Sequence, residues 1–305
     1  MSRAWLPLVV QIALFCPAAV TVGAHAIEPA PRTAATESAP ANSAIWAFRL
    51  PKEDSVSYRG VANFDAAGGG PGGMMYPAPN AVGLLAAIIT HAVIAESAKN
   101  SEKAKIQDEA DKILLPYRAV LDTHTNRELL SHAARLVRMP GEKLIIEKTE
   151  HPSGAWIVEA HPTFWMVQDQ SAFVLQNVIA MYSPRDSSKA AYRADITVVS
   201  LPRQGGDHQS FWTADSGEKL KQESANLVAQ SLDIALREAT GVLAPSSAVH
   251  KTFRYQEGSI EKMERGELIS TQCDRVVIRT LRGGLMSVPA RRPNQPSEAE
   301  ACSDK

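Results

Sequence analysis

The chain has 305 residues, with 32 lysines and arginines against 33 aspartates and glutamates, so its net charge is close to zero. Without a basic surplus, charge gives no reason to expect a nucleic-acid-binding protein or one held on anionic membranes. The length allows one large hydrophobic core or two small ones.

Residues 1–26 have the layout of a secretory signal peptide. Arg3 precedes a long apolar run, and the run ends in Ala-His-Ala, so we expect cleavage between Ala26 and Ile27. An uncleaved membrane anchor is the alternative. Lipidation of Cys16 is not expected, because Phe15 stands where a small residue is needed. We therefore expect a periplasmic or secreted protein.

Composition divides the remaining chain into three parts. Residues 27–43 are rich in Pro, Ala, Ser and Thr and predict a disordered linker. Residues 44–288 predict a single α+β domain. Residues 289–305 are polar and predict a disordered tail.

The domain begins with one clear strand, residues 45–50, and a weaker one at 58–62. A glycine-rich loop, Gly68–Gly73, follows and leads into residues 81–95, which are apolar except for Thr90 and His91. A helix there would be apolar almost all round and must be buried. It is shorter than the roughly 18–20 residues of a membrane span. We expect a central core helix; docking on a lipid surface or a partner subunit is the alternative.

A helical part is expected over residues 80–139. Apolar residues recur at helical spacing in 101–121, where Pro116 should kink or end the helix. The next helix should begin at Thr125, because Thr125 and Glu128 have the spacing of a capping box.

A sheet part is expected over residues 143–201. The predicted strands are 143–150, 155–160, 164–169, 172–182 and 190–201. The links between them are short, and a parallel return needs a dozen or more connecting residues. The sequence therefore predicts an antiparallel meander.

A helix over residues 216–240 should pack on that sheet. Asp215 and Glu218 again have capping-box spacing, and Gly241 is a natural stop. Further strands are expected between residues 250 and 288.

Two cysteines follow the predicted cleavage site, Cys273 and Cys302. An even count in an exported chain is compatible with one disulfide, and two free thiols are the alternative.

No residue is predicted to be catalytic or to bind a metal or cofactor. His151 and His161 stand near glutamates, but a strand between them would hold them roughly 20 Å apart, too far to share one metal ion. Ser216 and Lys219 match the S-x-x-K pattern of penicillin-recognising enzymes without its companion motifs. The glycine loop lacks the Gly-Lys-Ser/Thr ending of a phosphate-binding P-loop.

The order strand, helices, meander and capped helix resembles small exported α/β proteins and lipoproteins of proteobacteria whose function is unknown or related to envelope assembly. The resemblance covers about residues 76–240 and lies in Pro116-Tyr117-Arg118, Tyr192–Leu201, Trp212 and Asp215–Leu220. It departs from the lipoproteins in lacking their lipidated cysteine.

We therefore expect a non-catalytic binding or envelope-assembly protein that acts on an envelope partner or a membrane surface and not on nucleic acid. Two alternatives are a hydrolase with its site between the loop 68–73 and the sheet, and a binder of small apolar ligands. The sequence leaves the oligomeric state open.

Overall fold

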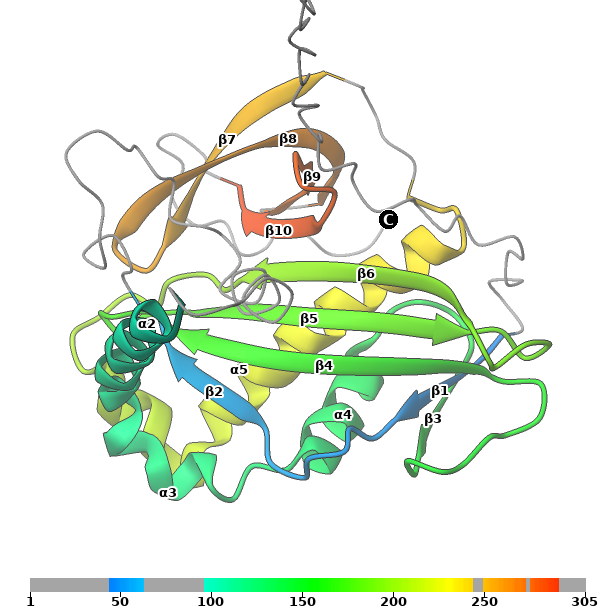
Figure 1. The fold of residues 1–305 in the computed structure, drawn as a ribbon, viewed down its shortest axis with the longest axis horizontal. Coiled ribbons are helices and arrows are strands. Elements are labelled where there is room, and N and C mark those ends of the chain that lie inside the picture. The colour runs from blue at the N-terminus through cyan, green and yellow to red at the C-terminus, as the bar shows by residue number, and fades with distance from the viewer. Residues whose placement is uncertain (1–43, 63–95, 244–248, 273–274, 291–305) are drawn as a thin grey trace, which may run out of the picture. The chain divides into compact units, whose positions relative to one another are not determined.

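The computed structural model describes residues 44–62, 96–243, 249–272 and 275–290, all within the compact unit Arg32–Lys305. In these residues helices pack with a large β-sheet (Figure 1), which confirms the α+β class. The loop 68–73, the apolar segment 81–95, both cysteines and the cleavage site lie outside the described residues, so the predictions made for them stay predictions.

The elements are named here with their bounds. The strands are β1 (Ile45–Arg49), β2 (Ser57–Gly60), β3 (Glu142–Ile146), β4 (Trp156–Met166), β5 (Phe173–Tyr182), β6 (Ala190–Val199), β7 (His250–Glu257), β8 (Ile260–Gln272), β9 (Arg275–Thr280) and β10 (Leu285–Pro289). The helices are α2 (Glu96–Asp111), the 3₁₀ helix η2 (Lys112–Tyr117), α3 (Arg118–Leu121), α4 (Asn126–Leu136) and α5 (His208–Ala239).

The prediction of an antiparallel meander is wrong, because the ten-stranded sheet formed by the described residues is mixed. Its order is β3-β1-β4-β5-β6-β10-β9-β8-β7, with β2 also paired to β4. The runs β4-β5-β6 and β7-β8-β9-β10 are antiparallel. The pairs β1–β3, β1–β4, β2–β4 and β6–β10 are parallel. These parallel partners are far apart in the chain, so short links between consecutive strands gave no indication of them.

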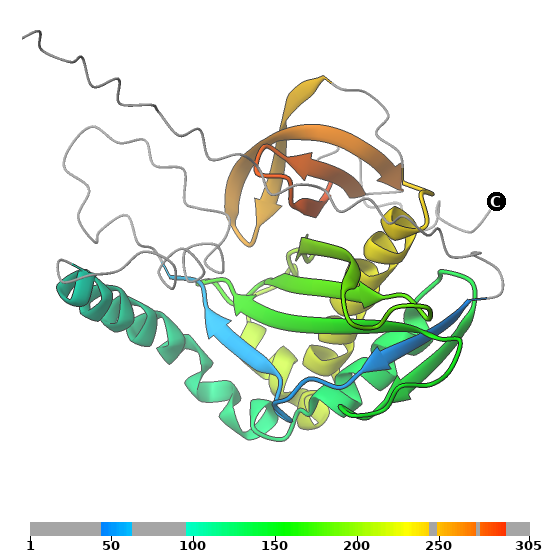
Figure 2. The ribbon, with the colours of Figure 1, turned by 45° about the vertical axis from the view of Figure 1, so that its right-hand side comes forward.

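A proline decides how the edge of β4 is used. The predicted strands 155–160 and 164–169 form one strand, β4, which contains Pro162. β1 pairs with β4 up to Glu159, and β2 pairs from Thr163 onward. Pro162 lacks an N–H and lies in the interval between them, where no ladder bond is needed on that edge. Figure 2 shows β1 and β2 following one another along the same side of β4.

The main core lies between the helices and one face of this sheet. Leu129 and Leu130 of α4 and Leu227 and Val228 of α5 belong to one buried cluster. Phe164 and Leu175 of the sheet and Tyr117 of η2 belong to the same cluster. The sheet therefore buries this face under α4 and α5, which lie behind β4–β6 in Figure 1.

The sheet also curls back on itself. Trp165 of β4 and Tyr255 of β7 share a second buried cluster, although five strands separate β4 from β7 in the sheet order. Asp169, in the β4–β5 turn, accepts hydrogen bonds from Ser171 N–H and Oγ–H and from Ser259 N–H in the β7–β8 turn. Gly258 has φ +62°, and a Cβ there would lie 2.8 Å from both Asp169 carboxylate oxygens, so the approach requires glycine.

Three of the four helix-boundary predictions hold. Gly241 follows Thr240, the C-cap of α5, and has φ 74°, as is usual for a glycine that ends a helix. Thr125 is the N-cap of α4 and its Oγ1 accepts from Glu128 N–H at 3.2 Å. Pro116 lies in η2, where the α-helical geometry of α2 has ended.

The predicted cap of the last helix at Asp215 is wrong, although a helical segment does start close to the predicted position, directly after a break at residues 214–217. α5 begins at His208 and is broken at residues 214–217, where Asp215 (φ 50°), Ser216 (φ 59°) and Gly217 (φ 81°) are left-handed. An N-cap residue is normally extended, so Asp215 cannot act as one in this conformation. A Cβ on Gly217 would overlap Val120 of α3, so this break lets α5 pack closely under α3.

Asp169 offers a test of the curled sheet. Asp169→Asn should lower the free energy of unfolding at pH 7 by about 1 kcal/mol, a value discounted for solvent screening of this partly exposed group. Desolvation raises the pKa of the native carboxylate, but the hydrogen bonds from Ser171 and Ser259 together outweigh it and hold the pKa at about 2. The pKa is lowered, so this stabilisation is complete above the unfolded value near pH 4 and is lost as the pH falls towards 2. Urea unfolding at pH 7 and pH 3 measures it.

Asp186→Asn is a matched control. Ser188 donates to Asp186 through its N–H at 2.9 Å and its Oγ–H at 2.6 Å, the same local arrangement as at Asp169, but without a bond to the β7–β8 turn. The control should lose less stability than Asp169→Asn. Equal losses in the two variants would show that the local turn, and not the contact between distant strands, is what Asp169 stabilises.

Candidate functional site

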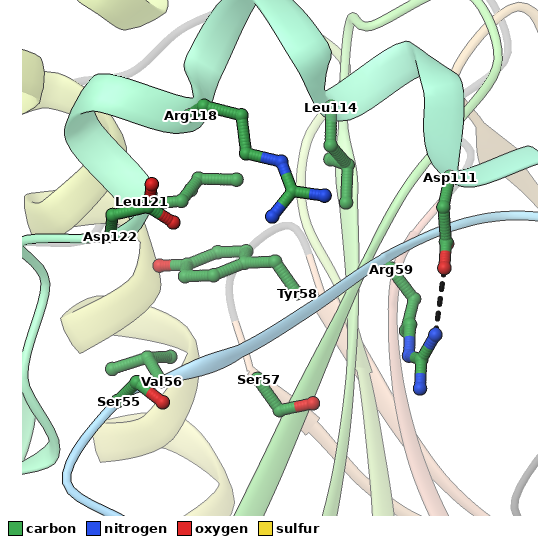
Figure 3. A pocket seen from close by; sticks show the side chains of 10 residues that line it. All are labelled: Ser55, Val56, Ser57, Tyr58, Arg59, Asp111, Leu114, Arg118, Leu121 and Asp122. Atoms are coloured by element: carbon green, nitrogen blue, oxygen red, sulfur yellow. Dashed lines mark hydrogen bonds and ion pairs between the residues drawn. The ribbon is translucent and has the colours of Figure 1, made fainter. Parts of the chain in front are cut away.

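A cleft of about 410 Å³ lies between β2 and the helical segment η2–α3 (Figure 3). It is lined by Ser55, Val56, Ser57, Tyr58, Arg59, Asp111, Leu114, Arg118, Leu121 and Asp122. Its volume is within the range of roughly 300–1,000 Å³ that is typical of small-ligand sites. Four of its ten lining residues are charged, which suits a polar ligand.

One end of the cleft is closed by a carboxylate that accepts three hydrogen bonds. Asp111, the last residue of α2, pairs with Arg59 at 2.7 Å and accepts from the N–H of Gly60 at 2.8 Å. Gln107 donates to the same carboxylate at 2.8 Å and to the C=O of Gly60 at 3.0 Å. These contacts fix α2 against the end of β2 and pair the charge of Asp111 with that of Arg59.

The opposite end is closed by backbone contacts with the turn before α4. Val56 N–H donates to the C=O of His124 at 3.2 Å, and Asn126 N–H donates to the C=O of Asp54 at 2.7 Å. Asn126 also donates from its side chain to the carbonyls of Glu53 and Ser55, each at 2.9 Å. The segment leading into β2 is therefore held to α4.

A buried hydrogen-bond chain forms the base of the cleft. Tyr58 Oη lies 2.9 Å from His124 Nδ1 and 2.7 Å from Ser224 Oγ, and Ser224 donates to the C=O of Leu220 at 2.9 Å. Each hydroxyl has one proton, so Ser224 donates to Leu220, Tyr58 donates to Ser224, and Nδ1–H of His124 donates to Tyr58. The chain connects β2, the turn before α4 and α5.

Burial sets the protonation of this chain. It raises the pKa of Tyr58 above its usual range and lowers the pKa of His124 to about 4. Near neutral pH both side chains are therefore neutral and neither changes its charge. General acid–base catalysis favours groups whose pKa lies near the working pH, so this pair is suited to holding structure.

Arg118 and Asp122 are the charges that remain available. Arg118 extends from α3 over the cleft towards Tyr58, and Asp122 lies one helical turn further on (Figure 3). Both residues are exposed. Among the described residues neither side chain has a hydrogen-bond or ion-pair partner, in contrast to Arg59 and Asp111. The open part of the cleft thus presents one cation and one anion.

The histidines weighed in the sequence lie apart from this cleft. His151 follows β3, and its Nδ1 lies 3.1 Å from an Arg49 nitrogen, whereas His161 is exposed on β4. Glu159 binds Arg49 at 2.7 Å and accepts from Tyr182 Oη at 3.0 Å, and Glu150 contributes only its C=O to Arg49. The described residues contain no group of three or more His, Cys, Asp or Glu side chains able to hold a metal ion.

Ser216 and Lys219 are also outside the cleft. Both are exposed at the break in α5, and Ser216 has a left-handed backbone. No described helix has both the length and the apolarity to cross a membrane.

Comparisons with protein-family models, with curated proteins and with solved structures find no significant match for this chain. The resemblance to exported proteobacterial proteins therefore stays an expectation.

Sequence reasoning did not find the cleft. Its walls come from residues 55–59 and 111–122, which are about 50 positions apart in the chain, and no local pattern pairs them. The only sequence signal was Pro116, which predicted that the helix would change direction close to Arg118.

His124 gives a test of the buried chain. Burial lowers the pKa of His124 to about 4. Between pH 6.5 and this value the unfolded state therefore binds a proton that the native state does not bind. The free energy of unfolding should fall by about 2 kcal/mol between pH 6.5 and 5. The variant His124→Gln keeps an amide that can donate to Tyr58 but has no group that titrates in this range. Its free energy of unfolding, measured with urea, should therefore be the same at the two pH values.

His250→Gln is the control, because His250 is exposed at the start of β7 and should leave the pH dependence as in the wild type. An unchanged pH dependence in His124→Gln would mean that the native state accepts the proton and that the chain is not closed to water.

Proposed function

We propose that this protein is a non-catalytic binding protein and that the cleft between β2 and η2–α3 is its ligand site. The observation that supports the proposal is the pair Arg118 and Asp122, two charges without partners among the described residues in a cleft whose other charges neutralise each other. Charged ligand groups would gain hydrogen bonds there without breaking an existing pair.

The chemistry of the cleft favours binding over catalysis. Tyr58 and His124 are the lining and adjoining groups with shifted pKa values, and burial moves both away from neutral pH. The four charged lining residues favour a polar ligand over the small apolar ligand considered from the sequence. A hydrolase whose site includes the loop 68–73 is the second candidate carried from the sequence, and no described contact favours it.

The proposal includes export of the protein from the cytoplasm. The signal-peptide pattern of residues 1–26 supports a periplasmic or secreted protein, and the ligand would then be a solute or envelope component of that compartment. Assembly with an envelope protein partner or a membrane surface remains part of this proposal.

A thermal-shift screen tests the site. The panel contains amino acids, short peptides, organic acids, phosphates and sugars. At least one of these compounds should raise the unfolding temperature of the mature chain, because a ligand that binds only the native state stabilises it. Arg118→Glu should abolish the shift.

Arg135→Glu is the matched control. Arg118 and Arg135 are both exposed arginines on short helices, α3 and α4, so the two variants make the same change of charge at comparable surface positions. The control should keep the shift. If Arg135→Glu abolished it and Arg118→Glu did not, the shallow hollow between α4 and α5 that Arg135 lines would be the site, and the proposal for the cleft would be wrong.

A further inference from the structure

Among the described residues, the outer edge of β2 has one residue whose backbone N–H and C=O are both without a hydrogen-bond partner. Val61 N–H donates to the C=O of Met166 in β4 at 2.9 Å, so by alternation Arg59 and Ser57 also direct their backbone groups to β4. Tyr58 and Gly60 direct theirs away from β4. Gly60 fits this pattern, because its N–H and C=O are bonded to Asp111 and Gln107.

Tyr58 is the exception on this edge. Within the described residues its N–H and its C=O have no hydrogen-bond partner, and Tyr58 lines the cleft. A donor and an acceptor on the same side of one extended residue match the pair of bonds that two residues exchange in an antiparallel ladder. A peptide residue can form both bonds at once, which is how an added strand is recognised.

The length of this open edge is limited. Val56 N–H is bonded to His124 on one side, and Gly60 is bonded to Asp111 and Gln107 on the other. The distance from residue 56 to residue 60 is about 13 Å at about 3.3 Å per residue. An extended segment of two or three residues fits this space. A continuous strand passing along β2 would have to break the contacts at both ends.

The free charges suit the ends of such a segment. Arg118 can donate to a terminal carboxylate, and Asp122 can accept from a terminal ammonium group. Arg118 is the first residue of α3 and Asp122 is its C-cap, so both lie on the helical wall of the cleft, opposite β2 (Figure 3). A short free peptide carries both groups close together, whereas the interior of a protein chain carries neither.

From these observations we propose that the cleft binds free peptides of two or three residues, extended along β2, with one residue bonded to the backbone of Tyr58 and the carboxylate bonded to Arg118. This inference rests on the proposed function, because it names the class of ligand for the same cleft. Successive side chains of the peptide would be directed to opposite faces of the sheet, as along any strand, while its backbone makes the contact with β2.

Calorimetry and amide NMR with trialanine test the proposal on the mature chain. Trialanine should bind, and trialanine amide should bind about tenfold more weakly, since it lacks the charge-assisted bond to Arg118. In Arg118→Ala the two peptides should bind equally. In Arg135→Ala, the matched control, the tenfold preference should remain. N-acetyl-trialanine should also bind more weakly than trialanine, because it lacks the ammonium group that Asp122 accepts from. In Asp122→Ala the acetylated and free peptides should bind equally.

Amide hydrogen exchange locates the backbone contact. Trialanine should slow exchange at Tyr58 N–H, which has no hydrogen-bond partner in the part of the chain that the structure describes. Exchange at the N–H groups of Arg59 and Gly60 should not change, because the first is directed to β4 and the second is bonded to Asp111.

Four results would overturn the inference. They are an acid-over-amide preference that persists in Arg118→Ala, an unchanged Tyr58 amide at saturating peptide, equal affinity for a seven-residue peptide blocked at both ends, and binding of a non-peptide panel compound with no peptide bound. The last result would contradict only the proposal that the ligand is a peptide, and the cleft would still be a ligand site. If no compound of any class bound, the proposed function would fail as well.

Discussion

Pro162 imposes the constraint on which the rest of the arrangement depends. A proline has no N–H for a ladder, and the backbone of Pro162 is directed to the same edge of β4 that receives β2, since Met166 at the alternate position bonds there. One long partner strand would leave a broken ladder at this position. The chain instead uses two short parallel strands, β1 before the proline and β2 after it. β2 thereby becomes an edge strand, and its outer edge forms one wall of the cleft.

The second wall depends on how α3 is held. η2 and α3 change direction after α2, and α5 carries a left-handed break where Gly217 meets Val120 without a Cβ between them. The chain of hydrogen bonds through Tyr58, His124 and Ser224 joins β2 to α5 and to the turn before α4. The position of the cleft is thus set by neutral groups at its base. The exposed charges of Arg118 and Asp122 are therefore available to a ligand. Binding sites of this kind combine a rigid base with a few free polar groups.

The curled half of the sheet is joined to this frame through the pairing of β10 with β6 and also through the β4–β5 turn. Residues Asp169 and Gln170 contact three separate parts of the protein. Asp169 accepts from Ser259 of the β7–β8 turn, while Gln170 accepts from Tyr117 through its side chain and from Trp212 through its C=O at 2.8 Å. Gln170 adopts φ 60°, a left-handed conformation that costs energy for a residue with a Cβ and that these contacts can offset. The β4–β5 turn is therefore both a chain reversal and a junction.

The sequence by itself determined what depends on local order. The α+β class, the first strand at 45–50, the cap at Thr125 and the change of helix geometry at Pro116 follow from periodicity, turn residues and the missing N–H of proline. It could not determine the partners of β1, β2 and β10, the break in α5, or the meeting of residues 55–59 with 111–122. Only the tertiary structure decided these features, because hydrogen bonding and packing between distant segments depend on which surfaces are buried together. The local sequence pattern of each segment does not specify its distant partner.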